Sequence, residues 1–202
     1  MATYVIVHGA YDGGWAWRGV ARELQAAGHE VFTVTLTGSG ERAHLASREV
    51  GLDTHNTDVA NVLRYGNLTD VLLVGHSYGG VVITGVAEQV PERIGQLVYL
   101  DALVPEDGQT VADLFDPAVM EFAEQAVKEH GEGWRIPHGL PDADRSTDST
   151  LNVLHQPVTV RNPQAAALKH TYVLFTAKPP EDTVLRPMME RIAARARARG
   201  WG

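Results

Sequence analysis

Short apolar runs alternate with amphipathic stretches along the chain. The runs are rich in β-branched residues and are typical of buried strands. They comprise residues 4–7, 31–36, 71–74 and 94–100. Between them, apolar residues recur at helical spacing in 15–27, 54–65 and 79–89. Strands that are apolar along their whole length and alternate with helices predict an α/β fold, a mostly parallel, doubly wound sheet covered on both faces.

This alternation breaks between residues 105 and 163, where acidic residues, Pro and Gly accumulate around a helical patch at 119–129. A long excursion between two strands of an α/β sheet is usually functional. We therefore predict a core formed by 1–104 and 164–202 and a cap formed by 105–163. The core resumes with an expected strand at 172–175 and a helix at 184–199. For the helix at 54–65, Thr54 or Asn56 is the expected N-cap.

Composition narrows the class of protein. The chain has 202 residues, of which 44% are hydrophobic, and a net charge of −8. An acidic chain lacks the basic stripe that nucleic acid requires, and no apolar run is long enough to span a membrane. There are no cysteines, which excludes disulfides and Cys-ligated zinc. The N-terminus lacks the features of a signal peptide, so we expect a cytoplasmic protein.

The most informative segment is a G-x-S-x-G motif, Gly75-His76-Ser77-Tyr78-Gly79, between an apolar strand and a helix. A sharp strand-to-helix turn of this kind exposes the serine hydroxyl above the sheet, and the glycines admit neighbouring backbone. The helix start also directs free N–H groups and a positive dipole end toward a developing oxyanion. This context predicts that Ser77 is a nucleophile. The plainer interpretation is that Ser77 only caps a helix.

A second segment supports this prediction. The first strand ends in His8-Gly9-Ala10, followed by Gly13-Gly14. Acyl transfer needs two backbone donors, one after the nucleophile and one from a loop after an earlier strand. The N–H groups of Ala10 and Tyr78 are the expected oxyanion hole. We expect the His8 side chain to be structural.

Several strings together resemble one family. HGAYDGGWAW, TGSGERAHL, GLDTH, LLVGHSYGG and LVYLDALVPEDG are similar to bacterial esterase-like α/β-hydrolases, a branch related to plant methyl-ester esterases and hydroxynitrile lyases. The resemblance covers residues 3–202. It implies a sheet of eight mostly parallel strands, here without some outer ones, with a cap after the strand that contains Asp101. It also implies Ser77 as nucleophile and the Ala10 and Tyr78 N–H groups as oxyanion hole.

The resemblance also bears on the reaction. Lyases of this family carry an acidic residue before the nucleophile and a threonine after the first-strand histidine. This chain has His76 and Gly9 at those positions, the pattern of the esterases. His76 is equally well explained as a packing residue.

The acid of the predicted triad has two candidates. In the plant relatives it follows the strand that corresponds to 172–175, where this chain has Thr176-Ala177-Lys178, and lysine cannot replace a carboxylate. Asp101 ends the preceding sheet strand, at the edge where catalytic groups of α/β sheets gather. The alternative is that Asp101 stabilises a turn. Asp182 is the second candidate acid.

The catalytic histidine has no clear position. The resemblance places it after one more strand, which would begin near Gly200-Trp201-Gly202. The histidines that follow Asp101 are His130, His138, His155 and His170, and none is expected to be the base. Without a base, Ser77 is a poorly activated alcohol. Three explanations stay open: the chain lacks the last strand, histidine loop and final helix of a longer enzyme, it is a non-catalytic relative, or a cap histidine substitutes.

The predicted function is therefore hydrolysis of a small carboxylic ester through an acyl-enzyme. The alternatives are a hydroxynitrile lyase-type C–C lyase and a non-catalytic small-molecule-binding protein. We expect no cofactor and no metal. The segment 38–43 fits G-x-G-x-x-A, but no acidic residue ends a strand about 20 residues later, so dinucleotide binding is disfavoured. The sequence leaves the ester and the oligomeric state open, and a homodimer is compatible with it.

Overall fold

A computed structural model of the chain describes residues 1–139, 144–177 and 184–202. Its centre is a sheet of five strands in which all neighbours are parallel, in the order β2-β1-β3-β4-β7. The strands are β1 (Thr3–Val7), β2 (Glu30–Val34), β3 (Val71–His76), β4 (Ile94–Leu100) and β7 (Lys169–Val173). The predicted α/β class and parallel sheet are confirmed.

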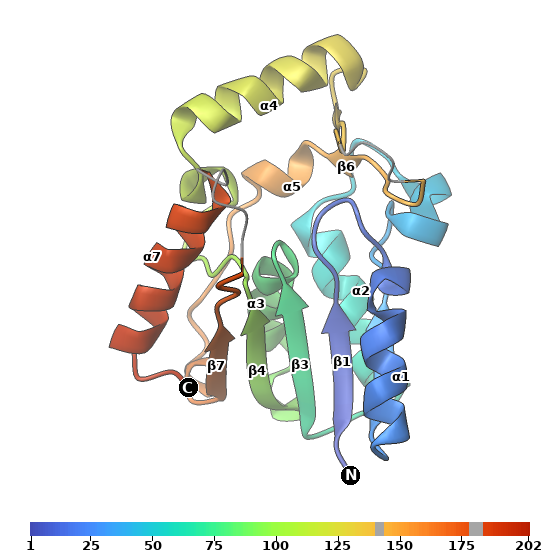
Figure 1. Cartoon of the computed structure of the whole chain (residues 1–202), viewed down its shortest axis with the longest axis vertical. Helices are drawn as coiled ribbons and strands as arrows, with labels where there is room; N and C mark the ends of the chain where they lie inside the picture. The colour runs from blue at the N-terminus through green and yellow to red at the C-terminus, as the bar shows by residue number, and fades with distance from the viewer. Residues whose placement is uncertain (140–143, 178–183) are drawn as a thin grey trace.

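Helices cover both faces of this sheet. The connection from β1 to β2 runs in one direction across the sheet, and the connections from β2 to β3 and from β3 to β4 run in the other. Because such crossovers are right-handed, the first helix lies on one face and the next two on the opposite face. Figure 1 shows α1 (Arg18–Ala26) in front of the sheet and α2 (Leu52–Tyr65) and α3 (Gly79–Gln89) behind it.

The main core lies between the central strands and the helix α3. Every residue of α3 from Gly79 to Ala87 is buried, and Val5, Val7 and Leu73 of the sheet are fully buried. Short 3-10 helices join these elements: η1 (Gly14–Trp17), η2 (Gly40–Leu45) and η3 (Pro91–Arg93). The carboxyl ends of β1, β3 and β4 are thus held on a rigid, fully packed layer.

The long excursion between β4 and β7 contains one long helix, α4 (Pro117–His130), and several short elements. The short elements are η4 (Ala112–Leu114), β5 (Arg135–Ile136), β6 (Ser149–Thr150), α5 (Asn152–His155) and α6 (Pro163–Ala166). Figure 1 shows α4, α5 and β6 beyond the carboxyl ends of the strands. Backbone and side-chain bonds of Thr147 to Tyr11 and Gly40 tie this excursion to the loops after β1 and β2.

Several element boundaries differ from those predicted, and three of the differences have a clear structural cause. The second strand ends at Val34 because Leu36 leaves the ladder and donates its N–H to His8 Nε2 at 3.1 Å. The helix predicted from 54 begins at Leu52 with Gly51 as N-cap, so neither Thr54 nor Asn56 caps it. The strand predicted at 172–175 is Lys169–Val173, because β4 pairs with the polar start of this segment.

The C-terminal segment returns to the outer edge of β7. The helix α7 (Leu185–Ala198) buries Met188, Met189 and Ile192. After it, Gly202 donates its N–H to His170 O at 3.1 Å, and its carbonyl accepts from Tyr172 N at 2.8 Å. These two bonds have the pattern of a parallel ladder. Among the described residues, no helix is long and apolar enough to cross a membrane.

Candidate active site

Ser77 occupies the turn between β3 and α3 in a left-handed backbone conformation, with φ of 51°. Such a conformation is strained for a residue other than glycine. The turn is held from both sides. Ser77 N donates to Leu100 O at 3.4 Å, and Ser77 O accepts from Gly80 N and from Leu103 N at 3.0 Å each. These three backbone hydrogen bonds therefore hold Ser77 in its strained conformation.

The glycines of the motif are required by close backbone contacts. A Cβ on Gly75 would lie 2.5 Å from Gly79 O, and one on Gly79 would lie 2.6 Å from Val7 O. A Cβ on Gly80 would lie 2.4 Å from Leu103 O. These distances are too short for any side chain, so the start of α3 packs directly on the end of β1 and on the segment that follows β4.

The loop after β1 lies beside Ser77. A Cβ on Gly9 would stand 3.1 Å from Ser77 Cβ, so only glycine allows this approach without displacement. The backbone N–H groups of Ala10 and Tyr78 donate to no other group among the described residues. Both predicted oxyanion donors are therefore available in the two segments that meet at Ser77.

His8 has the structural role expected for it. Its Nε2 accepts from Leu36 N, and its Nδ1 contacts Gly9 O at 2.7 Å. Burial lowers the pKa of His8 to about 4. A neutral, doubly engaged imidazole of this kind orders the loops after β1 and β2 rather than transferring protons.

Asp101 ends β4 in a second left-handed turn, with φ of 44°. Its N–H donates to Val173 O at 2.7 Å, and its carboxylate Oδ1 accepts from Phe175 N at 3.2 Å. The side chain is buried. Asp101 thus lies at the carboxyl edge of the sheet between β4 and β7, where a triad acid was expected, and it also caps the end of β7. The other candidate acid, Asp182, lies outside the described residues, as does Lys178.

Three of the histidines that follow Asp101 have described side-chain partners other than Ser77. His130 and His155 are largely exposed and lie 3.8 Å and 4.0 Å from the carboxylates of Glu129 and Glu124. His170 lies within β7 rather than before it, at the amino end of the strand, with its ring stacked on Trp201 at 4.3 Å. In the excursion, the backbone N–H of His138 donates to Asp148 Oδ1 at 3.2 Å.

His76 packs among aromatic rings beside the serine. Its ring meets Trp17 edge-on at 5.7 Å and stacks on Phe175 at 6.1 Å. Burial raises the pKa of the neighbouring Asp12 carboxyl, and the His76 charge opposes that shift. His76 therefore joins η1 to the end of β7, which supports its interpretation as a packing residue.

The sequence analysis did not predict the residues that bind the buried hydroxyl of Tyr78. The Tyr78 hydroxyl lies 2.9 Å from His55 Nδ1, and His55 Nε2 lies 3.0 Å from Thr37 O. Thr37 follows β2, His55 lies in α2 and Tyr78 precedes α3. Because the three residues come from separate segments, no local sequence pattern could have revealed their contacts. The GLDTH string contains this histidine but gives no indication of its partner.

A cavity of about 880 Å³ lies against the outer edge of β2, and Ser77 is not among the residues that line it. Trp15 lines it, and the guanidinium of Arg145 stands 5.7 Å from the Trp15 ring. The indole Nε1 of Trp15 is buried without a partner among the described residues. In the described ranges, no group of three or more His, Asp or Glu side chains is placed to hold a metal ion.

Comparison with known proteins accounts for this arrangement. A model of the alpha/beta hydrolase family matches residues 4–201. The chain belongs to this family. Among solved structures, an extracellular alpha/beta-hydrolase from a Paenibacillus species is 25% identical, with a TM-score of 0.79, over 95% of this chain and 86% of that one. Tomato methylketone synthase I, 18% identical with a TM-score of 0.71 over 96% and 84% of the two chains, shares the fold.

Curated relatives cover part of the chain. A carbendazim hydrolyzing esterase from Nocardioides sp. (strain SG-4G) is 52% identical over 119 residues, 59% of this chain and 49% of that protein. An alpha-hydroxynitrile lyase from Arabidopsis thaliana is 29% identical over 74% of this chain and 52% of the lyase. A putative chloroplastic methylesterase 14 of the same plant is 33% identical over 64% of this chain and 37% of its own length. The chain spans about half the length of the first two relatives.

Proposed function

We propose that this alpha/beta hydrolase cleaves small carboxylic esters through an acyl-enzyme on Ser77. The Ser77 hydroxyl attacks the ester carbonyl, and the alcohol leaves. Water then hydrolyses the acyl-enzyme. The Ala10 and Tyr78 N–H groups hold the oxyanion in both steps. Asp101 orients a histidine base, which takes the Ser77 proton and passes it to the leaving alcohol; none of the four histidines that follow Asp101 is assigned this role. The observation that carries the proposal is the strained Ser77 turn with Gly9 directly beside it.

The choice of an ester over a cyanohydrin rests on two neighbours of the serine. His76 and Gly9 form the pattern of the esterase branch, and Gly9 leaves no side chain between the loop and Ser77. The named esterase and methylesterase relatives support the same choice. The alternative, a C–C lyase, is favoured by the relative named as an alpha-hydroxynitrile lyase.

A substrate panel separates these functions. We expect hydrolysis of p-nitrophenyl acetate, loss of that activity in Ser77→Ala, and full retention in Ser39→Ala, a serine in the loop before η2. Carbendazim belongs in the panel because of the 52% identical relative. Release of cyanide from mandelonitrile without ester cleavage would instead support the lyase.

Binding without turnover would support the third alternative, a non-catalytic protein. The chemistry needs a base for Ser77, and the described side-chain contacts of His130, His155 and His170 are with other groups. Equal ester hydrolysis by wild type and Ser77→Ala would refute the nucleophile. We further propose that the protein acts in the cytoplasm, without a cofactor, and leave a homodimer as a prediction.

A further inference from the structure

A chain of hydrogen bonds runs from the loop after β2 to the residue that follows Ser77. The carbonyl of Thr37 lies 3.0 Å from His55 Nε2, and His55 Nδ1 lies 2.9 Å from the Tyr78 hydroxyl. The His55 and Tyr78 rings meet edge-on at 5.7 Å. Both side chains are buried, 4% exposed each. Bulk water therefore does not compete for the hydrogen bond between His55 and Tyr78.

The chemistry of the groups fixes the direction of each bond. A carbonyl oxygen only accepts, so His55 Nε2 carries the proton and donates to Thr37 O. His55 Nδ1 is then the acceptor, and the Tyr78 hydroxyl donates to it. Burial lowers the pKa of His55 and raises the pKa of Tyr78, which keeps both groups neutral. The link has one tautomer and one direction.

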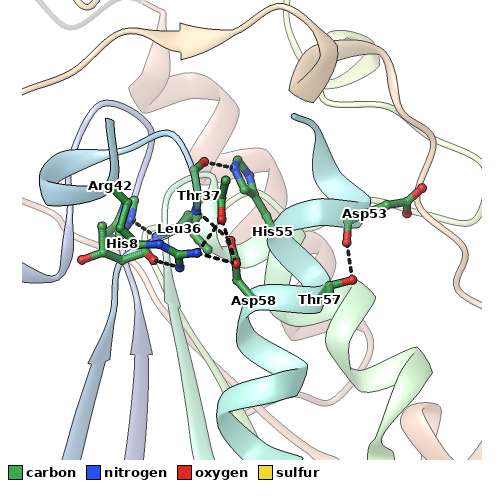
Figure 2. A network of polar contacts seen from close by, with 9 residues as sticks. His8, Leu36, Thr37, Arg42, Asp53, His55, Thr57 and Asp58 are labelled. Carbon is green, nitrogen blue, oxygen red and sulfur yellow. Dashed lines mark hydrogen bonds and ion pairs between the residues drawn. The ribbon is translucent and has the colours of Figure 1, made fainter. Parts of the chain in front are cut away.

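The Thr37 end of the link is firmly anchored. Asp58 accepts from Thr37 N at 2.7 Å and from Thr37 Oγ1 at 2.9 Å. Arg42 donates to Thr37 Oγ1 at 2.7 Å and to Asp58 Oδ1 at 3.2 Å. Figure 2 shows these residues converging on the loop after β2, with the His55 ring directed at the Thr37 carbonyl. The acceptor that His55 binds is thus held by a charge-assisted network.

The Tyr78 end of the link is next to the proposed reaction. Tyr78 precedes the first turn of α3 and has helical backbone angles, φ −54° and ψ −33°. Its N–H is one of the two proposed oxyanion donors, and its side chain leaves the same Cα toward the core. The shared Cα is the route by which a displaced phenol can turn the N–H, and catalysis is sensitive to displacements of about 1 Å.

We propose that His55 is a positioning residue for the acyl-transfer site, holding Tyr78 so that its backbone N–H faces the oxyanion formed at Ser77. This inference rests on the proposed serine mechanism. A purely structural role is the competing explanation, because any buried tyrosine hydroxyl needs a partner. The two explanations differ in whether the reactivity of folded protein changes.

The test measures the rate constant for labelling of Ser77 by a fluorophosphonate, per folded molecule. We expect His55→Leu and Tyr78→Phe each to lower it by about 10-fold, a fraction of the loss on deleting an oxyanion donor. The double variant should also lose only about 10-fold, because both changes break the same link. His55→Asn should stay within about 2-fold of wild type, since its Oδ1 can accept from Tyr78.

A matched control is available in the same core. The hydroxyl of Tyr99 lies 3.0 Å from Thr84 Oγ1, and both groups are buried. Tyr99→Phe should lower stability as Tyr78→Phe does and leave the labelling rate unchanged. Unchanged labelling in His55→Leu, or a 100-fold loss in the double variant, would overturn the proposal.

Failure of the proposed function is distinguished by a second measurement. If wild-type protein is not labelled, the serine mechanism fails, and the link is tested by NMR of the ¹⁵N-labelled protein. We expect the Nε2–H tautomer of His55 and a Tyr78 amide signal that shifts in His55→Leu and returns in His55→Asn. An Nδ1–H tautomer, or an unmoved Tyr78 amide, would refute the positioning role.

Discussion

Ser77 and Asp101 follow the neighbouring strands β3 and β4, and both have positive φ values, 51° and 44°. The Ser77 turn has a local framework, in which Gly75 and Gly79 admit close backbone contacts and α3 starts buried, and it is also bonded to Leu100 O and Leu103 N at the end of β4. The Asp101 turn is fixed by β7, more than seventy residues later in the chain, through the N–H of Phe175 and the carbonyl of Val173. The proposed nucleophile therefore needs the strand–turn–helix unit and the neighbouring β4, whereas the candidate acid also depends on β7, the last strand of the sheet.

The largest expected effect separates catalysis from turn stability at Asp101. Asp101→Asn keeps an oxygen that can accept from Phe175 N, so the free energy of unfolding should change by less than about 1 kcal/mol. Ester turnover should fall by about 10³–10⁴-fold, because the amide favours the wrong imidazole tautomer of the base. Denaturant unfolding and p-nitrophenyl acetate hydrolysis measure the two quantities. Loss of stability with unchanged turnover per folded molecule would make Asp101 a turn residue only.

The second prediction concerns the contact that joins the two turns. In Gly80→Ala the new methyl would meet Leu103 O at 2.4 Å and Ala102 Cβ at 2.8 Å. We expect a loss of about 2–4 kcal/mol in the free energy of unfolding, which exceeds the gain in helix propensity of about 1 kcal/mol. Gly19→Ala in the exposed helix α1 is the control, because nothing lies within 4 Å of its Cβ, and it should be neutral or stabilising. Equal stability of the two variants would show that the turns are not rigidly joined.

The smallest expected effect comes from a comparison of the backbone strain at Ser77 with that at Asp101. Ser77→Gly removes a Cβ from a left-handed residue and should raise the free energy of unfolding by about 0.5–1 kcal/mol, after the entropy cost of glycine. Asp101→Gly should give no gain, because aspartate tolerates this conformation better and its carboxylate holds Phe175 N. Thermal unfolding of both variants measures the difference. A destabilised Ser77→Gly would show that the serine turn is not strained.

The features that the sequence predicted correctly are those fixed by contacts within a short segment of the chain. The strand–turn–helix at Ser77 was correct because an apolar strand, two glycines and a helix start act within about ten residues. The last strand was placed three residues too late, because Lys169 and His170 pair with β4 despite their polarity. His55 was not predicted, since its contact with Tyr78 exists only after α2 packs against α3. The assignment of Asp101 as the acid stays a prediction.

The central claim is that Ser77, presented by the strand-to-helix turn, is the nucleophile. The most direct measurement is the mass of the intact protein after reaction with a fluorophosphonate, followed by peptide mapping. We predict one adduct per chain, on Ser77, and no adduct in Ser77→Ala or in heat-unfolded protein. No adduct on folded wild-type protein, or an adduct at another serine such as Ser39, would contradict the account.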